Sequence, residues 1–244
     1  MATPQILVVT SCTGEKLYKP STQLKLEDFK DISRLQKYSE QLSEFAAPAG
    51  KMYTGQQHLQ AMEGVHILRE NLGQTSVDVL ILSAGYGLIS ESQTIVPYEV
   101  TFTTMKAQEI DEWAQDLGIH QAFEEAIIGY DLVFMLLGEN YLRALSLPVL
   151  TQPSQTLIFL ASHGSKNYIQ GFEANTFILP LSNADAKRFG YGLVGLKGFI
   201  FNKFASIAAH APDWLQRVYT SPETFTQAIS SDATQMELTL GLPL

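Results

Sequence analysis

The sequence is poor in cysteine, in charged residues and in long apolar segments. The single cysteine, Cys12, excludes an intrachain disulfide and a cysteine-rich zinc site, and it favours a reducing, cytoplasmic location. Charged residues make up only 17% of the chain and hydrophobic residues 45%, a balance that excludes a disordered protein. The longest apolar run, around 131–137, is far shorter than the roughly 20 residues of a transmembrane helix, so we expect no membrane partner. No basic segment precedes the first apolar run, which argues against a signal peptide.

Positive charge is also scarce. The 244 residues include 25 acidic and 16 basic side chains, giving a formal net charge of −9. A protein that binds duplex DNA through its phosphates needs a basic surface. The net negative charge therefore favours a small-molecule or nucleobase ligand and disfavours nucleic acid. Only a local basic patch would bind nucleic acid. His58 and His66 are eight residues apart and no H-E-x-x-H motif occurs, so we expect no metal; we also expect no cofactor.

Apolar, β-branched runs alternate with segments of helical periodicity. Continuously apolar runs predict buried strands at 6–10, 77–82, 131–137 and 156–160, and a fifth strand at 177–181, placed at an edge by Pro180. Helical spacing predicts helices at 31–45, 54–71, 110–117, 122–128, 141–145, 183–188, 199–209 and from 221. The pattern predicts an α/β fold with a mostly parallel sheet of four to five strands and helices on both faces. We expect an α/β core domain at 1–182, with a helical C-terminal region at 183–244 packed on it.

Each of the first four predicted strands ends in small or polar residues. These strand ends are Ser11–Cys12, 83–87, 138–140 and 162–166. Ligands of parallel sheets bind beyond the carboxyl ends of the strands. If the strands are adjacent, the four ends converge on one crevice.

Cys12 is the candidate nucleophile at the first of these ends. Lys16 lies in the loop that follows, and a nearby ammonium group favours the reactive thiolate. The alternative is that Cys12 is a small buried hydrophobic side chain.

The second strand end is rich in glycine. Gly85 and Gly87 flank Tyr86 and follow Ser83, so the backbone there could approach an anion or a ring closely. The segment matches neither a Walker loop, nor G-x-G-x-x-G, nor the G-x-S-x-G elbow. A ligand site and a tight turn are equally compatible with it.

The other two strand ends contain candidate acid–base and ligand-binding groups. Glu139 is a candidate proton donor or acceptor and Asn140 a candidate ligand-binding amide, although both residue types also cap helices. His163 is a candidate proton shuttle beside Lys166, with an ordinary surface-loop histidine as the alternative.

A second glycine-rich segment occupies 190–198. Lys187, Arg188 and Lys197 surround it, which suggests a phosphate-binding loop or a nucleic-acid contact. The alternative is a flexible connection before a buried helix.

Three stretches together resemble a known family. Residues 81–89 (ILSAGYGLI), followed by 95–99 (IVPYE), resemble a block of the YaaA peroxide-stress family and of a related uncharacterised bacterial and phage domain family. The segment 52–57 (MYTGQQ) fits the tyrosine–glycine segment of those families, and Cys12 with Lys16 is closer to the uncharacterised one. The resemblance implies ligand-binding roles for Tyr53 and Tyr98, and a link to lowering intracellular iron under peroxide stress and to DNA binding.

A weaker resemblance is to the core domain of archaeosine synthase. Its cysteine–lysine–tyrosine–serine spacing is matched by Cys12, Lys16, Tyr18 and Ser21, whereas Leu17 replaces a proline and Leu24 a histidine. In that family the pattern acts on a nitrile-bearing deazaguanine in tRNA, so the resemblance implies ligand contacts for Tyr18 and Ser21.

Two hypotheses follow from the sequence. The first is an enzyme acting on a nucleobase or nucleoside, with Cys12 as nucleophile, Lys16 keeping it ionised, and Glu139 or His163 moving protons. The ligand would then contact the remaining candidates, which are Ser11, Tyr18, Ser21, Tyr53, Ser83, Gly85, Tyr86, Gly87, Tyr98, Asn140 and Lys166. The second is a non-catalytic stress-response protein that binds nucleic acid through Lys187, Arg188 and Lys197.

Overall fold

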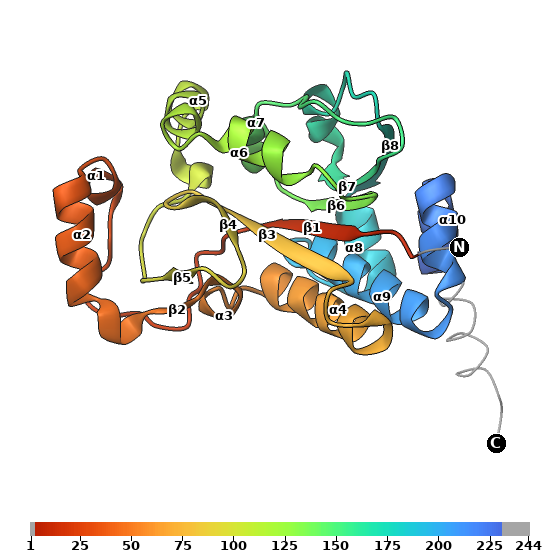
Figure 1. Ribbon diagram of the computed structural model, residues 1–244, viewed down its shortest axis with the longest axis horizontal. Coiled ribbons are helices and arrows are strands. Elements are labelled where there is room, and N and C mark those ends of the chain that lie inside the picture. Colours follow the sequence, from red (N-terminus) through yellow and green to blue (C-terminus); the bar gives the residue numbers. More distant parts are fainter. Residues whose placement is uncertain (1–2, 231–244) are drawn as a thin grey trace.

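The fold is built around one six-stranded sheet, seen in a computed structural model that describes residues 3–230. The strand order is β4-β3-β1-β6-β7-β8, and every neighbouring pair is parallel except β3 with β4 (Figure 1). The strands are β1 (Ile6–Ser11), β3 (Val77–Ser83), β4 (Gly87–Ser90), β6 (Leu132–Leu136), β7 (Thr156–Ser162) and β8 (Asn175–Leu181). The predicted α/β fold with a mostly parallel sheet is therefore confirmed.

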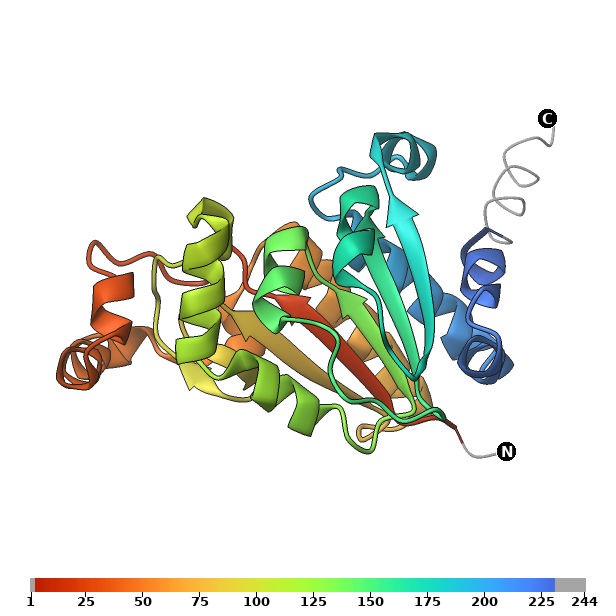
Figure 2. The same cartoon turned by 90° about the horizontal axis from the view of Figure 1, so that it is seen from above.

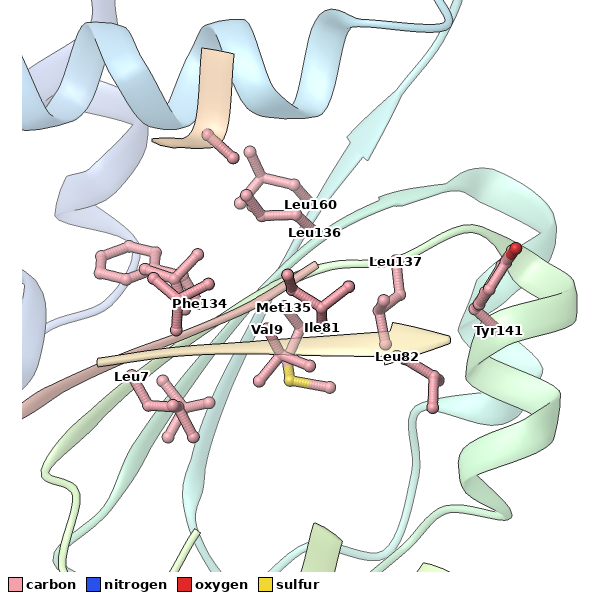
Figure 3. Close-up of a cluster of buried hydrophobic side chains, with 14 of the residues drawn as sticks. Leu7, Val9, Ile81, Leu82, Phe134, Met135, Leu136, Leu137, Tyr141 and Leu160 are labelled. Atoms are coloured by element: carbon pink, nitrogen blue, oxygen red, sulfur yellow. The ribbon is translucent and has the colours of Figure 1, made fainter. Parts of the chain in front are cut away.

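The central strands β1 and β6 are almost entirely apolar because helices cover both faces of the sheet, and their polar residues are Thr10 and Ser11 at the end of β1. Every residue of β1 and β6 is buried. Phe134 and Leu136 point toward the face covered by one helix layer, and Met135 toward the other (Figure 3). In β1, Val9 pairs with Met135, which places their side chains on the same face. A strand buried on both faces loses the polar–apolar alternation typical of an exposed sheet.

The helices form two layers. In Figure 1, α4 (Gln56–Leu72) and α9 (Leu196–His210) lie below the sheet, and α5 (Ala107–Asp116), α6 (Ile119–Ala126) and α7 (Glu139–Leu145) lie above it. Figure 2 shows the upper layer from above, with α1 (Leu26–Phe29) and α2 (Ile32–Gln41) projecting at one end of the molecule. The remaining short elements are η1 (Ser43–Phe45), β2 (Ala47–Pro48), α3 (Ala49–Met52), β5 (Thr94–Ile95), η2 (Phe102–Thr104) and η3 (His163–Tyr168). No helix within 3–230 has both the length and the apolar character needed to cross a bilayer.

Helices α4 and α9 pack with their backbones unusually close. A Cβ atom built on Gly64 of α4 would lie 2.9 Å from the Cα of Asn202 in α9. One built on Gly198 of α9 would overlap the carbonyl oxygen of Gln57. Glycine at these positions therefore brings the first turn of α9 directly onto the first turn of α4.

The C-terminal region is helical and packs on the sheet. It contains α8 (Asn183–Phe189), α9, α10 (Asp213–Thr220) and a helical stretch at 224–230. The rings of Phe201 and Phe204 in α9 lie 5.2 and 5.5 Å from that of Phe134 in β6, and Phe225 lies 5.9 Å from it. These rings belong to the same buried cluster as the strands. The part of the predicted region beyond 230 lies outside the described residues.

Some elements differ from the sequence prediction. β4 forms where a loop was expected, because the chain reverses at 83–87 and pairs with β3 for four residues. The predicted helix at 31–45 divides into α2 and η1, and α10 was not predicted. Pro180 does lie on an edge strand, β8, as predicted.

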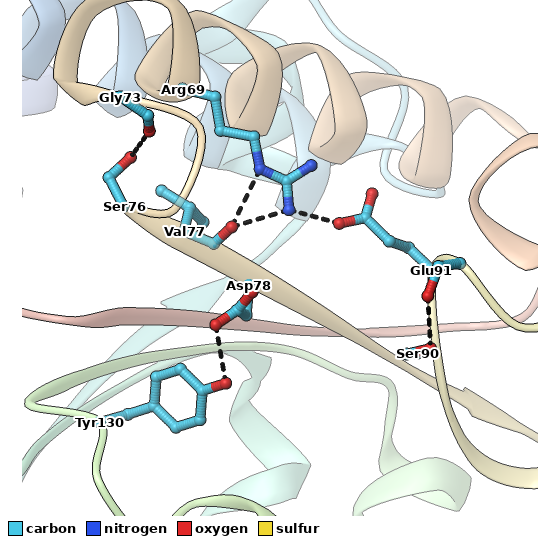
Figure 4. Close-up of polar contacts among 9 residues, drawn as sticks. Arg69, Gly73, Ser76, Val77, Asp78, Ser90, Glu91 and Tyr130 are labelled. Carbon is cyan, nitrogen blue, oxygen red and sulfur yellow. Dashed lines mark hydrogen bonds and ion pairs between the residues drawn. The ribbon is translucent and has the colours of Figure 1, made fainter.

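Polar contacts hold the N-terminal end of β3 (Figure 4). The Nε and Nη2 atoms of Arg69 in α4 donate to the carbonyl of Val77 at 2.9 and 2.7 Å, and the guanidinium also pairs with Glu91. The hydroxyl of Tyr130 donates to Asp78 at 2.9 Å. Together these bonds tie the end of α4 and the start of β3 to the strand-connecting loops.

His58 is a buried histidine from which we expect a pH dependence of folding. Its Nε2 lies 3.0 Å from the carbonyl oxygen of Gly50, whereas its buried Nδ1 has no partner. Burial lowers the pKa of His58, although the Gly50 carbonyl and the charge of Glu91 act in the opposite direction. The unfolded chain therefore binds a proton at about pH 6.5 that the folded protein resists.

We expect the free energy of unfolding to fall as the pH is lowered below about 6.5, by up to about 1.4 kcal/mol per pH unit until the folded pKa is reached. Urea unfolding of the wild type and of His58→Gln at several pH values measures this slope. The other four histidines are exposed and stay in place as an internal control. An equal slope in both proteins would show that His58 does not cause it.

Candidate active site

A cavity of about 770 Å³ opens at the carboxyl ends of β1 and β6. Its walls come from five parts of the chain: the loop after β1, the start of α4, the segment before α5, the start of α7 and the start of α9. The lining residues are Ser11, Cys12, Thr13, Gly14, Glu15, Gly55, Gln56, Gln57, Thr101, Thr103, Gly138, Glu139, Asn140, Tyr141, Val194 and Lys197. A volume of this size suits a small organic ligand.

Cys12 is held firmly at the floor of this cavity. Its backbone N–H donates to the carbonyl of Leu82 at 2.9 Å, which continues the pairing of β1 with β3. The residue is only 7% exposed, and its Sγ atom lies 3.1 Å from the hydroxyl of Tyr141. The thiol is thus both reachable from the cavity and hydrogen-bonded.

Tyr141 supplies the group that faces the sulfur. It lies in the first turn of α7, just beyond β6 (Figure 3), and its ring packs edge-on against Phe102 at 5.3 Å. Burial, and then the charge of Cys12, raise the pKa of Tyr141 well above its usual value. The hydroxyl therefore keeps its proton near neutral pH and can donate it in a hydrogen bond to a thiolate.

A chain of buried hydroxyls lies behind Cys12. The hydroxyl of Tyr98 is 2.7 Å from Ser83 Oγ and 2.8 Å from the hydroxyl of Tyr53. Ser83 Oγ already accepts the backbone N–H groups of Gly85 and Tyr86, so its own proton is directed to Tyr98. Burial raises the pKa of Tyr98, and the charge of Cys12 raises it further. These hydroxyls form a neutral, proton-rich wall next to the sulfur.

Lys16 lies close to this wall but outside the main cavity. Its side chain is buried, with Nζ 4.3 Å from the centre of the Tyr98 ring and 3.3 Å from the Thr13 carbonyl, to which it donates. Burial lowers the pKa of Lys16, whereas the charges of Cys12 and Glu99 raise it. Lys16 also lines a neighbouring cavity of about 580 Å³, which shares Gly14 and Thr101 with the first.

Two amide side chains give the cavity hydrogen-bonding capacity. Gln57 Nε2 donates to the carbonyl of Leu136 at 2.8 Å, and Asn140 Nδ2 donates to that of Phe102 at 3.1 Å. These bonds fix both amide groups. Each leaves a carbonyl oxygen to accept hydrogen bonds from N–H groups of a ligand.

The end of β7 does not reach the cavity. Its residues form η3, in which His163 and Lys166 are exposed and do not line the cavity wall. The nearest approach is at Gly164, where a built Cβ would lie 3.2 Å from Glu139 Oε2. Residues 83–87 do not line the cavity either, so the predicted convergence of all four strand ends is wrong for β3 and β7 and holds for β1 and β6.

The polar groups of the turn at 83–87 form hydrogen bonds within the protein. The amides of Gly85 and Tyr86 are used by Ser83, and a Cβ on Gly85 would lie 2.7 Å from the ring of Phe29. The Tyr86 hydroxyl donates to the carbonyl of Val96 at 3.3 Å, and Gly87 begins β4. The tight-turn interpretation thus fits Gly85, Tyr86 and Gly87.

Tyr18 and Ser21 lie away from the cavity. Both are exposed, and the ring of Tyr18 packs on Phe45 at 5.8 Å. Ser11, Cys12, Glu139 and Asn140 are the candidates that the fold brings together in the cavity wall. Tyr53, Ser83 and Tyr98 lie behind it, and neither Tyr18 nor Ser21 lines it.

Sequence reasoning missed several residues of the cavity. Tyr141 follows Asn140 directly, so the strand-end rule would have found it if extended by one residue. Gln57 and Thr101 carry no such signal, because their place depends on how α4 and the segment before α5 pack. Among the residues at 3–230, no group of three or more histidine, cysteine, aspartate or glutamate side chains could hold a metal ion.

The fold and the cavity define an α/β protein with a hydrogen-bonded thiol at the end of a central parallel strand. Residues 38–173, more than half of the sequence, match the model of a family of unknown function, DUF6884, and the chain belongs to this family. No curated protein matches the sequence.

Proposed function

We propose that this protein is an enzyme that uses Cys12 as a nucleophile on a nucleobase or nucleoside-type ligand. The observation that carries the proposal is the 3.1 Å contact between Cys12 Sγ and the Tyr141 hydroxyl at the floor of the cavity. A neutral hydroxyl that donates to sulfur favours the thiolate, which is the nucleophilic form of cysteine.

The cavity walls support a ligand with several N–H groups. Acceptors are available on Gln57 and Asn140, and the exposed carboxylate of Glu139 lies on the same wall. Nucleobases present N–H donors along their edges and offer a flat apolar face. Glu139 is also the ionisable group best placed to exchange protons with the ligand, whereas His163 lies outside.

A thiolate suits attack on an electrophilic carbon such as a nitrile or an activated ring position. With a nitrile-bearing deazaguanine, as the resemblance to archaeosine synthase suggests, the sulfur would add to the nitrile carbon and form a C–S bond. One π bond of the nitrile breaks, and its nitrogen takes up the proton that the thiol has lost. The product is a covalent thioimidate whose mass equals that of protein plus base.

The alternative of a stress-related nucleic-acid-binding protein has weaker support. Lys187 and Arg188 are exposed on α8, and Arg188 donates to Ser230 at 3.3 Å. Lys197, the third cation of the suggested patch, lines the cavity instead. Lys187 and Arg188 alone would contact few phosphates of a nucleic acid, so they would contribute little affinity.

Alkylation tests the nucleophile directly, because the chain has one thiol. We expect iodoacetamide to modify the folded protein once at pH 7, as measured by intact mass, and nucleosides or deazaguanine bases to slow the reaction by occupying the cavity. The nitrile-bearing base should itself add to the wild type.

Cys12→Ser is the matched control and should take up neither reagent. A thiol that reacts only after denaturation would contradict the nucleophilic role. Alkylation that no base or nucleoside slows, together with no adduct, would contradict the ligand class.

A further inference from the structure

We infer that Lys197 forms an anion-binding subsite of the same cavity, so that the ligand is a phosphate-bearing nucleotide rather than a free base. This inference rests on the proposed function and adds to it the substrate class. It concerns the cavity wall formed by the starts of α4 and α9.

Lys197 is placed as a ligand-binding cation. Its side chain is half-buried and lines the cavity. No carboxylate or other hydrogen-bond acceptor pairs with it in the described part of the chain, and burial lowers its pKa. A desolvated ammonium group with no carboxylate partner gains most from an anion that enters the cavity.

Two helix N-termini near Lys197 add partial positive charge to that of its ammonium group. No side chain caps the N-terminus of α9 at Gly195, nor that of α4 at Gly55, and Gly55 also lines the cavity. The close packing at Gly198 and Gln57 brings these two helix starts together. Both helix dipoles then favour negative charge where Lys197 lies.

Two carboxylates share the cavity with Lys197. Glu15 and Glu139 line it as well, but both are exposed, so solvent and salt screen them more strongly than the half-buried ammonium. Val194, which is 83% exposed, adds an apolar surface at the rim next to Lys197. Acceptors for N–H groups, an apolar surface and one cation together fit a base with an attached phosphate.

Calorimetric titration with the four common ribonucleoside 5′-monophosphates and the matching nucleosides tests the subsite. We expect at least one nucleotide to bind the wild type at least about tenfold more tightly than its nucleoside. Lys197→Met should remove that difference and leave the nucleoside affinity unchanged, whereas Lys197→Arg should retain most of it. Lys187→Met, which removes an exposed cation outside the cavity, should behave as the wild type does.

A wild type that binds nucleoside and nucleotide equally would overturn the inference without any variant. So would Lys197→Met retaining the preference for the nucleotide. The outcome is separable from that of the proposed function: protection of Cys12 by nucleosides with no gain from phosphate removes only the subsite. Nucleotide binding that depends on Lys197, with a Cys12 inert to iodoacetamide, removes only the nucleophile.

Discussion

Replacing Gly198 with alanine is expected to lower the free energy of unfolding by about 3 kcal/mol, at the upper end of the cost of overpacking. The added methyl group would overlap the backbone carbonyl of Gln57, which a rotamer change cannot move away. Because alanine normally stabilises a helix relative to glycine by up to about 1 kcal/mol, the expected effect is opposite in sign to helix propensity.

Urea unfolding followed by circular dichroism measures this difference. Gly192→Ala is the matched control: a Cβ there meets nothing within 4 Å, so the stability should stay close to that of the wild type. A Gly198→Ala protein as stable as the control would contradict the close contact between the backbones of α4 and α9.

The second large effect is expected for Tyr141→Phe. This change removes the hydroxyl 3.1 Å from Cys12 Sγ and keeps the ring that packs on Phe102. A hydrogen bond to a charged group contributes about 1.5–3 kcal/mol, and each 1.4 kcal/mol corresponds to a factor of ten. The rate of iodoacetamide alkylation at pH 7 should therefore fall by about tenfold or more.

Tyr130→Phe provides the comparison for this experiment. Its hydroxyl bonds Asp78 near the start of β3 (Figure 4), far along the strand from Cys12, so its removal should leave the alkylation rate unchanged. An unchanged rate in Tyr141→Phe would show that the hydroxyl does not activate the thiol. Thermal unfolding of both variants separates a loss of activation from a loss of structure.

The sheet could be predicted from the sequence because its strands are buried on both faces. Residues 132–136 and 157–160 are apolar throughout, which few surface segments are. β4 was missed since four residues beginning with glycine give no period to detect. Its pairing with β3 depends on the turn at 83–87, whose geometry is set by Ser83 and by the ring of Phe29 packed on Gly85.

The site could be predicted only where it follows the strands. Cys12, Glu139 and Asn140 follow β1 and β6. Because these two strands are parallel neighbours, the three residues lie together at the carboxyl ends of the strands. Lys197 is more than 180 residues from Cys12 in sequence, and its position depends on the glycine contacts between α4 and α9. His163 was expected beside them for the same reason as Glu139, but η3 leaves it on the surface.

The central position of β1 has a consequence for the nucleophilic role proposed for Cys12. With a paired strand on each side and its own amide bonded to Leu82, the backbone at Cys12 has little freedom to adapt to different molecules. Under the proposed function, the electrophilic carbon of the ligand would have to approach the sulfur along a direction fixed by the sheet. The loops around the cavity would then determine which ligands reach the thiol. Exchanging those loops would be the way to change the ligand selectivity.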